Sequence, residues 1–475
     1  MTNEQVRKLG LLQVRDAIAR GDVTSEHAVA AAIEQAERFN ASHGLFITFT
    51  PEAALQQARE ADAARAAGGP LGPLHGVPIT IKDNIDVAGV PTSAGSKVFV
   101  NRVPAHDAHV VQRLKAAGAI ALGQTNMHEW AMGGTSNNPH YGAVRNPWLI
   151  DRIPGGSSGG AAACIALRIG YAALGTDSAG SVRIPACLCG AVGYKPTHGV
   201  VSLSGCVPST SYHTDHVGPI TRSVADAEQM FSIMRGYDPT DTDSSQRQPE
   251  PVTGIEDLKG LIVGIPETGF WEDVDADVDH VCRGALDLLV QAGAELRPIR
   301  LQHWDLLGAA RVASAAEGYL FHEPYLKNQP QDYSEELRYR IMAGQYILAT
   351  DYIRAARARR LVLDELSDAA RSVDVLATPA LPVTAYPTLA SSFTPKGRSR
   401  PLAGGAMNTS LIRNTQPFNW AGLPAITLPA GLSSEGLPIG FHLAAKAFDD
   451  YRLLAIAARV EHLLNFKAGP NVLQA

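Results

Sequence analysis

The stretch PGGSSGGAAACIALRIGYAALGTDSAGSVRIPA, residues 154–186, holds two turns of small residues separated by a helical pattern at 160–169. Glycine is needed where the backbone turns sharply or approaches a ligand closely, so both turns are candidate parts of a site. Around this stretch, short apolar runs at 77–81, 119–123 and 192–194 alternate with helical patterns such as the one at 108–117. This alternation predicts an α/β domain with a substantially parallel sheet.

The rest of the chain shows no repeat and no long linker. Residues 5–67 have helical spacing, with a helix start expected at 22–26 because Thr24 and Ser25 precede apolar positions. Further strands are expected at 261–265, 373–378 and 425–428, and further helices at 278–292 and, as one long helix, at 338–367. We therefore expect an N-terminal helical segment over 1–67, packed on one continuous domain over 68–465.

The composition excludes several classes of protein. With 475 residues, a formal net charge of −6, 45% hydrophobic and 19% charged residues, the chain is typical of an ordered globular protein. Mild acidity argues against nucleic acid as a partner, and no apolar run reaches the roughly 18 residues of a membrane span. The polar N-terminus lacks a signal-peptide core, and the five cysteines are typical of a reduced compartment. A soluble cytoplasmic enzyme remains.

The segment GVPITIKDNI, residues 76–85, places Lys82 at the end of an apolar strand pattern. A lysine at such a position often extends its charged end to solvent. Only ten of the 41 basic residues are lysine, however, so the chain mostly uses arginine for surface charge. Because lysine loses its proton on burial and arginine does not, Lys82 is also a candidate general base.

The first small-residue turn, PGGSSGG at 154–160, is open to three interpretations. It lacks the Lys-Ser/Thr ending of a phosphate-binding loop, which argues against a nucleotide site. It matches the G-x-S-x-G pattern of a nucleophile elbow, but the residues before it, 151–154, do not form the apolar strand that an elbow requires. A plain glycine–serine loop is the third interpretation.

The second turn, GTDSAGSVRIPA at 175–186, presents successive backbone N–H groups that can converge on one point, as an oxyanion hole requires. Ser181 ends the turn and is a candidate nucleophile, which needs a nearby base. No histidine lies in these three segments, and the nearest ones, His198 and His216, are expected to be loop residues.

Together these segments identify a family resemblance. The chain resembles the amidase signature hydrolases, which use a Ser–cis-Ser–Lys triad. The matching motifs occur in the family's order over roughly residues 60 to 460, namely GVPITIKD, GQTNMHEWAMGGTSNN, RNPW, PGGSSGG, GTDSAGSVRIPA, CGAVGYKPTHG, HVGPITRSVADA and NWAGLPAITLPAG. The resemblance implies that family's fold, a single large α/β domain with a central mixed, substantially parallel sheet covered by helices.

The resemblance also implies roles for individual residues. Ser181 is expected to be the acyl-forming nucleophile, Ser157 the proton relay behind a cis Gly156–Ser157 peptide, and Lys82 the neutral base. The backbone N–H groups of Ser178, Ala179, Gly180 and Ser181 are expected to hold the oxyanion, and Ala131, Met132 and Gly133 to contact substrate. Ser158 is expected to be structural.

No metal or other cofactor is expected. Cys187 and Cys189 form a C-x-C pair without a second ligand pair, and His106 and His109 are a weaker signal still.

The expected reaction is cleavage of a carboxamide-type C–N bond through a serine acyl-enzyme, giving a carboxylic acid and ammonia or a small amine or hydrazine. An apolar or aryl acyl group is the first expectation, because Trp130, Met132, Trp304, Tyr319 and Phe321 supply aromatic and apolar candidates for a pocket or core. The alternative is a glutamine-hydrolysing subunit of a tRNA-dependent amidotransferase that supplies ammonia to a partner. The expected partner is a small-molecule amide-type substrate. Neither nucleic acid nor a membrane is expected as a partner, and a homodimer is the one assembly left open.

Overall fold

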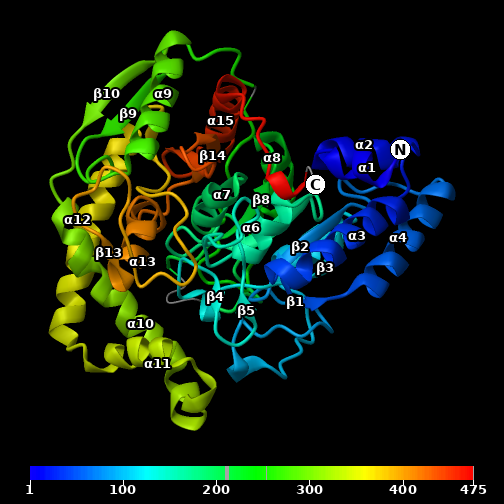
Figure 1. Cartoon of the computed structure of the whole chain (residues 1–475), viewed down its shortest axis with the longest axis horizontal. Coiled ribbons are helices and arrows are strands. Elements are labelled where there is room, and N and C mark those ends of the chain that lie inside the picture. The colour runs from blue at the N-terminus through cyan, green and yellow to red at the C-terminus, as the bar shows by residue number, and fades with distance from the viewer. Residues whose placement is uncertain (209–212, 253, 474–475) are drawn as a thin grey trace.

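One large mixed sheet runs through the computed structural model, which describes residues 1–208, 213–252 and 254–473 (Figure 1). Within those residues it has eleven strands, in the order β1 (Phe46–Phe49), β3 (Ile120–Thr125), β2 (Pro78–Lys82), β6 (Ala172–Thr176), β8 (Val217–Thr221), β7 (Val192–Lys195), β14 (Ala425–Leu432), β15 (Pro438–Ala444), β11 (Val375–Pro379), β9 (Ile262–Pro266) and β10 (Glu295–Ile299). Pairing is parallel from β3 through β2 to β6 and from β11 through β9 to β10, and antiparallel between β6 and β11. The expected α/β fold with a mixed central sheet is confirmed.

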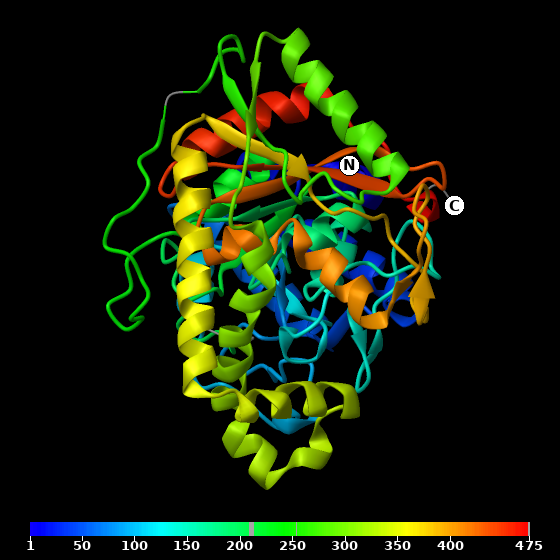
Figure 2. The ribbon, with the colours of Figure 1, turned by 90° about the vertical axis from the view of Figure 1, so that its left-hand side faces the viewer.

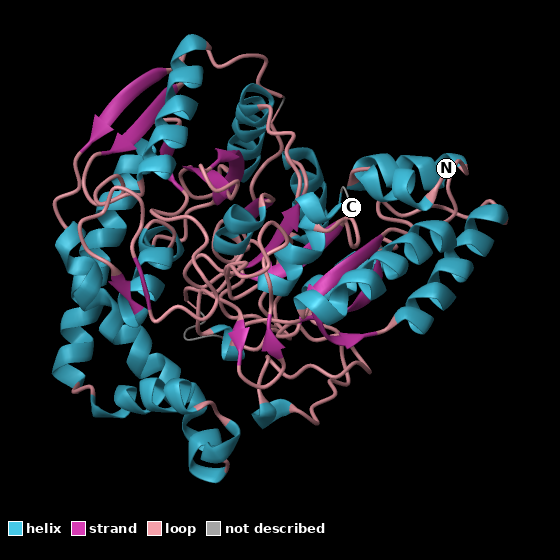
Figure 3. Cartoon of the chain, in the orientation of Figure 1, coloured by secondary structure: helices cyan, strands magenta, loops and turns pink. Residues whose placement is uncertain are grey.

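Helices surround this sheet (Figure 3). They are α1 (Asn3–Lys8), α2 (Leu11–Arg20), α3 (Ser25–His43), α4 (Pro51–Ala66), α5 (His109–Ala116), α6 (Gly159–Ala166), α7 (Arg183–Cys189), α8 (Val224–Met234), α9 (Ala276–Gln291), α10 (Leu307–Asn328), α11 (Glu335–Met342), α12 (Ala349–Arg371), α13 (Gly404–Arg413), α14 (Gln416–Trp420) and α15 (Asp450–Leu464). Two short hairpin-like pairs, β4 (Asn137–Asn138) with β5 (Gly142–Ala143) and β12 (Ser392–Phe393) with β13 (Leu402–Ala403), lie outside the main sheet.

Each face of the sheet has its own layer of helices. Helices α2, α5, α8, α9 and α15 share one apolar core with Ile79 and Ile81 of β2. Helices α3, α6 and α7 pack on the other face. Because side chains alternate along a strand, Lys82 lies on the face opposite Ile81, toward α6. The alternation of side chains along β2 therefore places Lys82 on the face covered by α6.

Local sequence explains the N-terminal helices. In α2, Leu11, Val14 and Ile18 form the buried face, and the helix ends at Gly21 with a φ of 79°. The hydroxyl of Thr24 caps α3 by accepting a hydrogen bond from the His27 backbone N–H, as the 22–26 pattern predicted.

Strand β1 also falls within the segment expected to be helical, and it pairs antiparallel with β3. The proposed boundary at residue 67 stays a prediction.

A helical arm, made of α10, α11 and α12, extends from one end of the molecule (Figure 2). The prediction of one helix over 338–367 is wrong, because α11 ends at Met342 and α12 begins at Ala349. The chain turns between them close against α10, where a Cβ on Gly344 would meet the Ala315 carbonyl oxygen at 2.3 Å. Amphipathic spacing continues through this break, so periodicity alone did not reveal it.

Candidate active site

Lys82 is buried at the carboxyl end of β2 and makes short contacts. Its Nζ lies 2.7 Å from Ser157 Oγ and 2.7 Å from Thr176 Oγ1. Asn84 in turn donates its side-chain N–H to Thr176 Oγ1 at 3.1 Å. The lysine amine is thus held between two hydroxyl groups, one of which belongs to the expected proton relay.

Burial lowers the pKa of Lys82 to about 7 from 10.5, although the charges of Asp177 and Asp215 oppose this effect. The desolvated interior disfavours the ammonium form. A substantial fraction of Lys82 is therefore neutral near pH 7, as a general base must be.

Ser157 lies in the loop that enters α6, after a cis peptide bond between Gly156 and Ser157. Its carbonyl oxygen accepts hydrogen bonds from the His128 backbone N–H at 3.1 Å and from Ser136 Oγ at 3.2 Å. The next residue, Ser158, donates its hydroxyl to the Thr176 carbonyl at 3.3 Å and its backbone N–H to the Ser181 carbonyl at 3.3 Å. Ser158 thus links the two small-residue turns.

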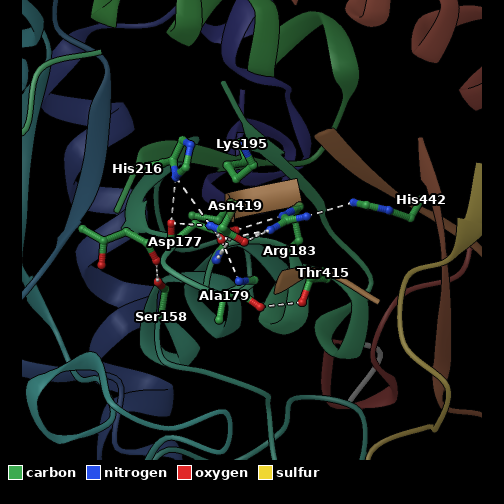
Figure 4. A network of polar contacts seen from close by, with 12 residues as sticks. Ser158, Asp177, Ala179, Arg183, Lys195, His216, Thr415, Asn419 and His442 are labelled. Atoms are coloured by element: carbon green, nitrogen blue, oxygen red, sulfur yellow. Dashed lines mark hydrogen bonds and ion pairs between the residues drawn. The ribbon is translucent and has the colours of Figure 1, made fainter. Parts of the chain in front are cut away.

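Asp177 organises the turn that carries Ser181 (Figure 4). Its carboxylate accepts hydrogen bonds from the backbone N–H groups of Gly180 at 2.7 Å and Val182 at 3.2 Å. It also forms a forked ion pair with Arg183, with two contacts of 3.0 Å, and both side chains are fully buried. Burial alone would raise the pKa of Asp177, but the charge and hydrogen bonds of Arg183 outweigh it and hold that pKa well below its usual range.

Residues distant in the sequence complete this network. Asn419 bridges the pair, donating to Asp177 Oδ1 at 2.7 Å and accepting from Arg183 Nη2 at 2.6 Å. Arg183 Nη1 lies 3.1 Å from His442 Nε2, and Thr415 donates its hydroxyl to the Ala179 carbonyl at 2.6 Å. The turn is therefore held in place by Asn419 of α14, by Thr415 directly before that helix, and, through Arg183, by His442 of β15.

The same turn leaves a set of backbone donors available. Among the described residues, no acceptor is found for the backbone N–H groups of Ser178, Ala179 and Ser181. The N–H of Gly180, expected as a fourth donor, is engaged by Asp177. Three backbone donors of one turn, for which the described residues supply no acceptor, suit a developing oxyanion.

A cavity of about 420 Å³ opens onto this turn. It lies within the range of about 300–1,000 Å³ typical of small-molecule sites. Its walls include all three residues expected to contact substrate, Ala131, Met132 and Gly133, together with Ser178, Ala179 and Ser181.

Of the aromatic and apolar candidates, Met132 and Tyr319 line the cavity. Trp130 and Phe321 instead pack in an apolar cluster with α11, and Trp304 packs on Phe270. The structure thus gathers the predicted site residues, while their catalytic and binding roles remain predictions.

The other candidates lie in structural positions. His216 is buried, with its Nδ1 2.8 Å from the Thr214 carbonyl oxygen, and burial lowers its pKa well below the usual value. Cys187 and Cys189 are buried and free. Within the described residues, no three histidine, cysteine or acidic side chains come together as a metal site.

Sequence reasoning missed several residues that the fold brings to the site. They are Thr176, Arg183, Thr415 and Asn419 around the reacting groups, and Arg311, Glu336, Arg340 and Gln416 in the cavity wall. Thr176 and Arg183 lie in the motif at 175–186, and Asn419 begins the motif NWAGLPAITLPAG, so these three carried a usable signal. The others come from segments without a motif of their own.

Comparison with known proteins places the chain in context. The family model described as Amidase matches residues 27–454. A glutamyl-tRNA(Gln) amidotransferase subunit of Nitratidesulfovibrio vulgaris is 37% identical over 480 residues, which cover 94% of this chain and 95% of that relative.

Two solved structures extend the comparison. A chain from a vestigial protein complex, connected with the origins of an s-triazine catabolic enzyme, has a TM-score of 0.88 at 31% identity and covers 96% of this chain and 98% of its own. The glutamyl-tRNA(Gln) amidotransferase subunit from Thermotoga maritima has a TM-score of 0.76 at 31% identity, covering 97% of this chain and 94% of its own.

The comparison corrects the expectation about partners. We expected an enzyme whose partners are a small-molecule amide and, at most, a second copy of itself, with nucleic acid excluded. This is wrong, because the similar curated proteins are named as one subunit of a larger enzyme, and that enzyme's name refers to glutamyl-tRNA(Gln). Mild net acidity was a poor guide, since net charge describes the whole chain and not its individual faces. No helix in the described part of the chain is long and apolar enough to span a membrane.

Proposed function

This chain belongs to the amidase family, and from that premise we propose that it is the amide-hydrolysing subunit of an amidotransferase. In this role it releases ammonia from glutamine for a partner subunit that modifies glutamyl-tRNA(Gln). The similarity to the amidotransferase subunit of Nitratidesulfovibrio vulgaris, over 94% of the chain, supports this role. It favours the alternative stated above over an aryl or apolar acyl substrate.

The observation that carries the proposed chemistry is the buried 2.7 Å contact between Lys82 Nζ and Ser157 Oγ. Ser181 Oγ attacks the amide carbonyl carbon, and its proton moves through Ser157 to the neutral Lys82 amine. The backbone N–H groups of Ser178, Ala179 and Ser181 stabilise the oxyanion.

The tetrahedral intermediate then collapses. The C–N bond breaks, the departing nitrogen takes a proton from Ser157 and leaves as ammonia, and Ser181 retains the acyl group as an ester. Water attacks the ester with the same relay as base, so one glutamine and one water give one glutamate and one ammonia. No further reactant is needed.

Glutamine hydrolysis tests this chemistry directly. The protein, purified with any subunits that accompany it, should release ammonia from glutamine, and Ser181→Ala should lower the rate by at least about 10³-fold because the acyl acceptor is lost. A fluorophosphonate should add mass to the peptide containing Ser181. Ser158→Ala is the matched control and should retain most of the rate. Labelling at Ser158 would contradict the proposed mechanism and support a nucleophile elbow.

A further inference from the structure

Glu129 links the body of the fold to the helical arm. It begins the turn 129–132, which contains the cavity residues Ala131 and Met132, and its side chain is buried. The backbone N–H of Ser334, the residue directly before α11 of the arm, donates to both carboxylate oxygens, at 3.3 and 3.4 Å. The carboxylate thus connects the arm to a turn of the cavity wall.

Two further groups hold this carboxylate from the body of the fold. Glu129 Oε1 accepts a hydrogen bond from Ser96 Oγ at 3.0 Å and lies 2.8 Å from His140 Nε2. Burial alone would raise the pKa of Glu129, but the hydrogen bonds from these groups and from the arm outweigh it and lower that pKa. Because an ionised carboxylate accepts a hydrogen bond more strongly than a neutral group does, the link to the arm is charge-assisted.

The turn 129–132 has an unfavourable backbone conformation. Trp130 and Ala131 have φ values of 53° and 55°, in the left-handed region, although neither residue is glycine. Such conformations are costly for residues that have a Cβ, and they persist only where the surrounding structure holds them. Part of that surrounding structure is the arm, since the rings of Trp130 and Tyr333 stack with their planes at 17°.

The end of the same turn also contacts the arm. Arg340 of α11 donates to the Met132 carbonyl oxygen. Arg340 and Met132 both line the cavity, so this contact lies at the proposed substrate site. Both ends of the turn 129–132 are therefore bonded to the arm.

We propose that Glu129 is a positioning residue, whose carboxylate holds the turn 129–132 against the helical arm and thereby places Ala131 and Met132 in the wall of the substrate cavity. This inference rests on the proposed function, in which the substrate occupies that cavity. Glu129 itself does not line the cavity. Its loss should therefore weaken substrate binding more than it slows the chemistry at Ser181.

Two substitutions break the link from its two sides. Glu129→Gln removes the charge, and Ser334→Pro removes the N–H donor. Proline fits position 334, because Ser334 has a φ of −62° and the preceding residue has a ψ of 149°. In protein purified with any accompanying subunits, each variant should raise KM for glutamine roughly 5- to 50-fold and lower kcat by less than about threefold. The rate at which a fluorophosphonate labels Ser181 should stay within about twofold of wild type, because the reacting groups are untouched.

A double variant and two controls complete the test. Because both substitutions remove the same link, Glu129→Gln combined with Ser334→Pro should raise KM little more than either alone. Leu348→Pro is the matched control, since Leu348 lies on the same arm with a φ of −69° and its N–H has no acceptor among the described residues. Leu348→Pro and Ser334→Ala, which keeps the N–H, should both leave KM within about twofold of wild type.

The outcomes separate this inference from the proposed function. A wild-type KM in Ser334→Pro would overturn the inference, even if Glu129→Gln fails to fold. Additive effects in the double variant, or a loss of Ser181 labelling in parallel with turnover, would also overturn it, because a merely structural role lowers both. Ammonia release that survives Ser181→Ala would instead reject the proposed function.

Discussion

Lys82 is the residue whose ionisation should control the rate. In the proposed mechanism its neutral form accepts the proton that Ser181 loses, and burial lowers the pKa of Lys82 to about 7. Because the ammonium form is inactive, kcat/KM should rise with pH through that value and level off above it. The pH profile of kcat/KM, measured on the wild-type protein, should therefore show an acid limb near pH 7.

Substitution of the same residue checks the assignment. Lys82→Arg keeps the positive charge but does not deprotonate, so it should be about as inactive as Lys82→Ala. A Lys82→Arg protein that works with the wild-type pH profile would place the base elsewhere. The exposed Lys97 offers a control, since Lys97→Arg should leave the profile unchanged.

At the scale of an element, the turn 177–181 depends on a buried ion pair with α7. Asp177 receives two contacts from Arg183 and also holds the backbone of Gly180 and Val182. Removing the arginine leaves a buried carboxylate unpaired, which costs about 3–5 kcal/mol in comparable cases. Arg183→Met should lower the free energy of unfolding by about that amount in urea titrations, and lower kcat more than it raises KM.

An exposed ion pair provides the control for that experiment. Arg300 lies 3.4 Å from Glu267, and its side chain is 89% exposed. Because solvent screens such pairs, Arg300→Met should change the free energy of unfolding by less than about 1 kcal/mol. A similarly small effect in Arg183→Met would show that the pair does not support the turn.

At the scale of the whole molecule, the helical arm and the body of the sheet meet at the site. The arm supplies Arg311 and Arg340, whereas Lys82, Ser157 and Ser181 come from β2 and the loops at α6 and α7. Tyr333 and Leu337 of the arm pack against Trp130, directly before the cavity residues Ala131 and Met132. The cavity is thus bounded by residues from both parts of the fold.

The proposed subunit role gives a prediction at this scale. The tagged chain, isolated from its own source under gentle conditions, should copurify with at least one other subunit. With glutamine labelled by ¹⁵N at the side-chain amide, that assembly should transfer the label to glutamyl-tRNA(Gln), as detected by mass spectrometry. Isolation of the chain alone, with full amide hydrolysis and no transfer, would contradict the subunit role.

The sequence by itself determined the α/β class, six of the eleven strands of the main sheet to within a few residues, the Thr24 cap and the three candidate reacting residues. These features depend on local periodicity or on short motifs, which contiguous residues carry. Its partner expectation failed because net charge describes a whole chain and not what an assembly contacts.

Only the tertiary structure decided the rest. It added β1 to the sheet, divided the expected helix at 343–348, and brought Asn419 to Asp177 and Gln416 to Arg311. Asp177 and Asn419 are 242 residues apart, and Arg311 and Gln416 are 105 apart. Local sequence pattern does not reveal either pair, because each contact forms only after the strands of the sheet have paired and the arm has packed on Trp130.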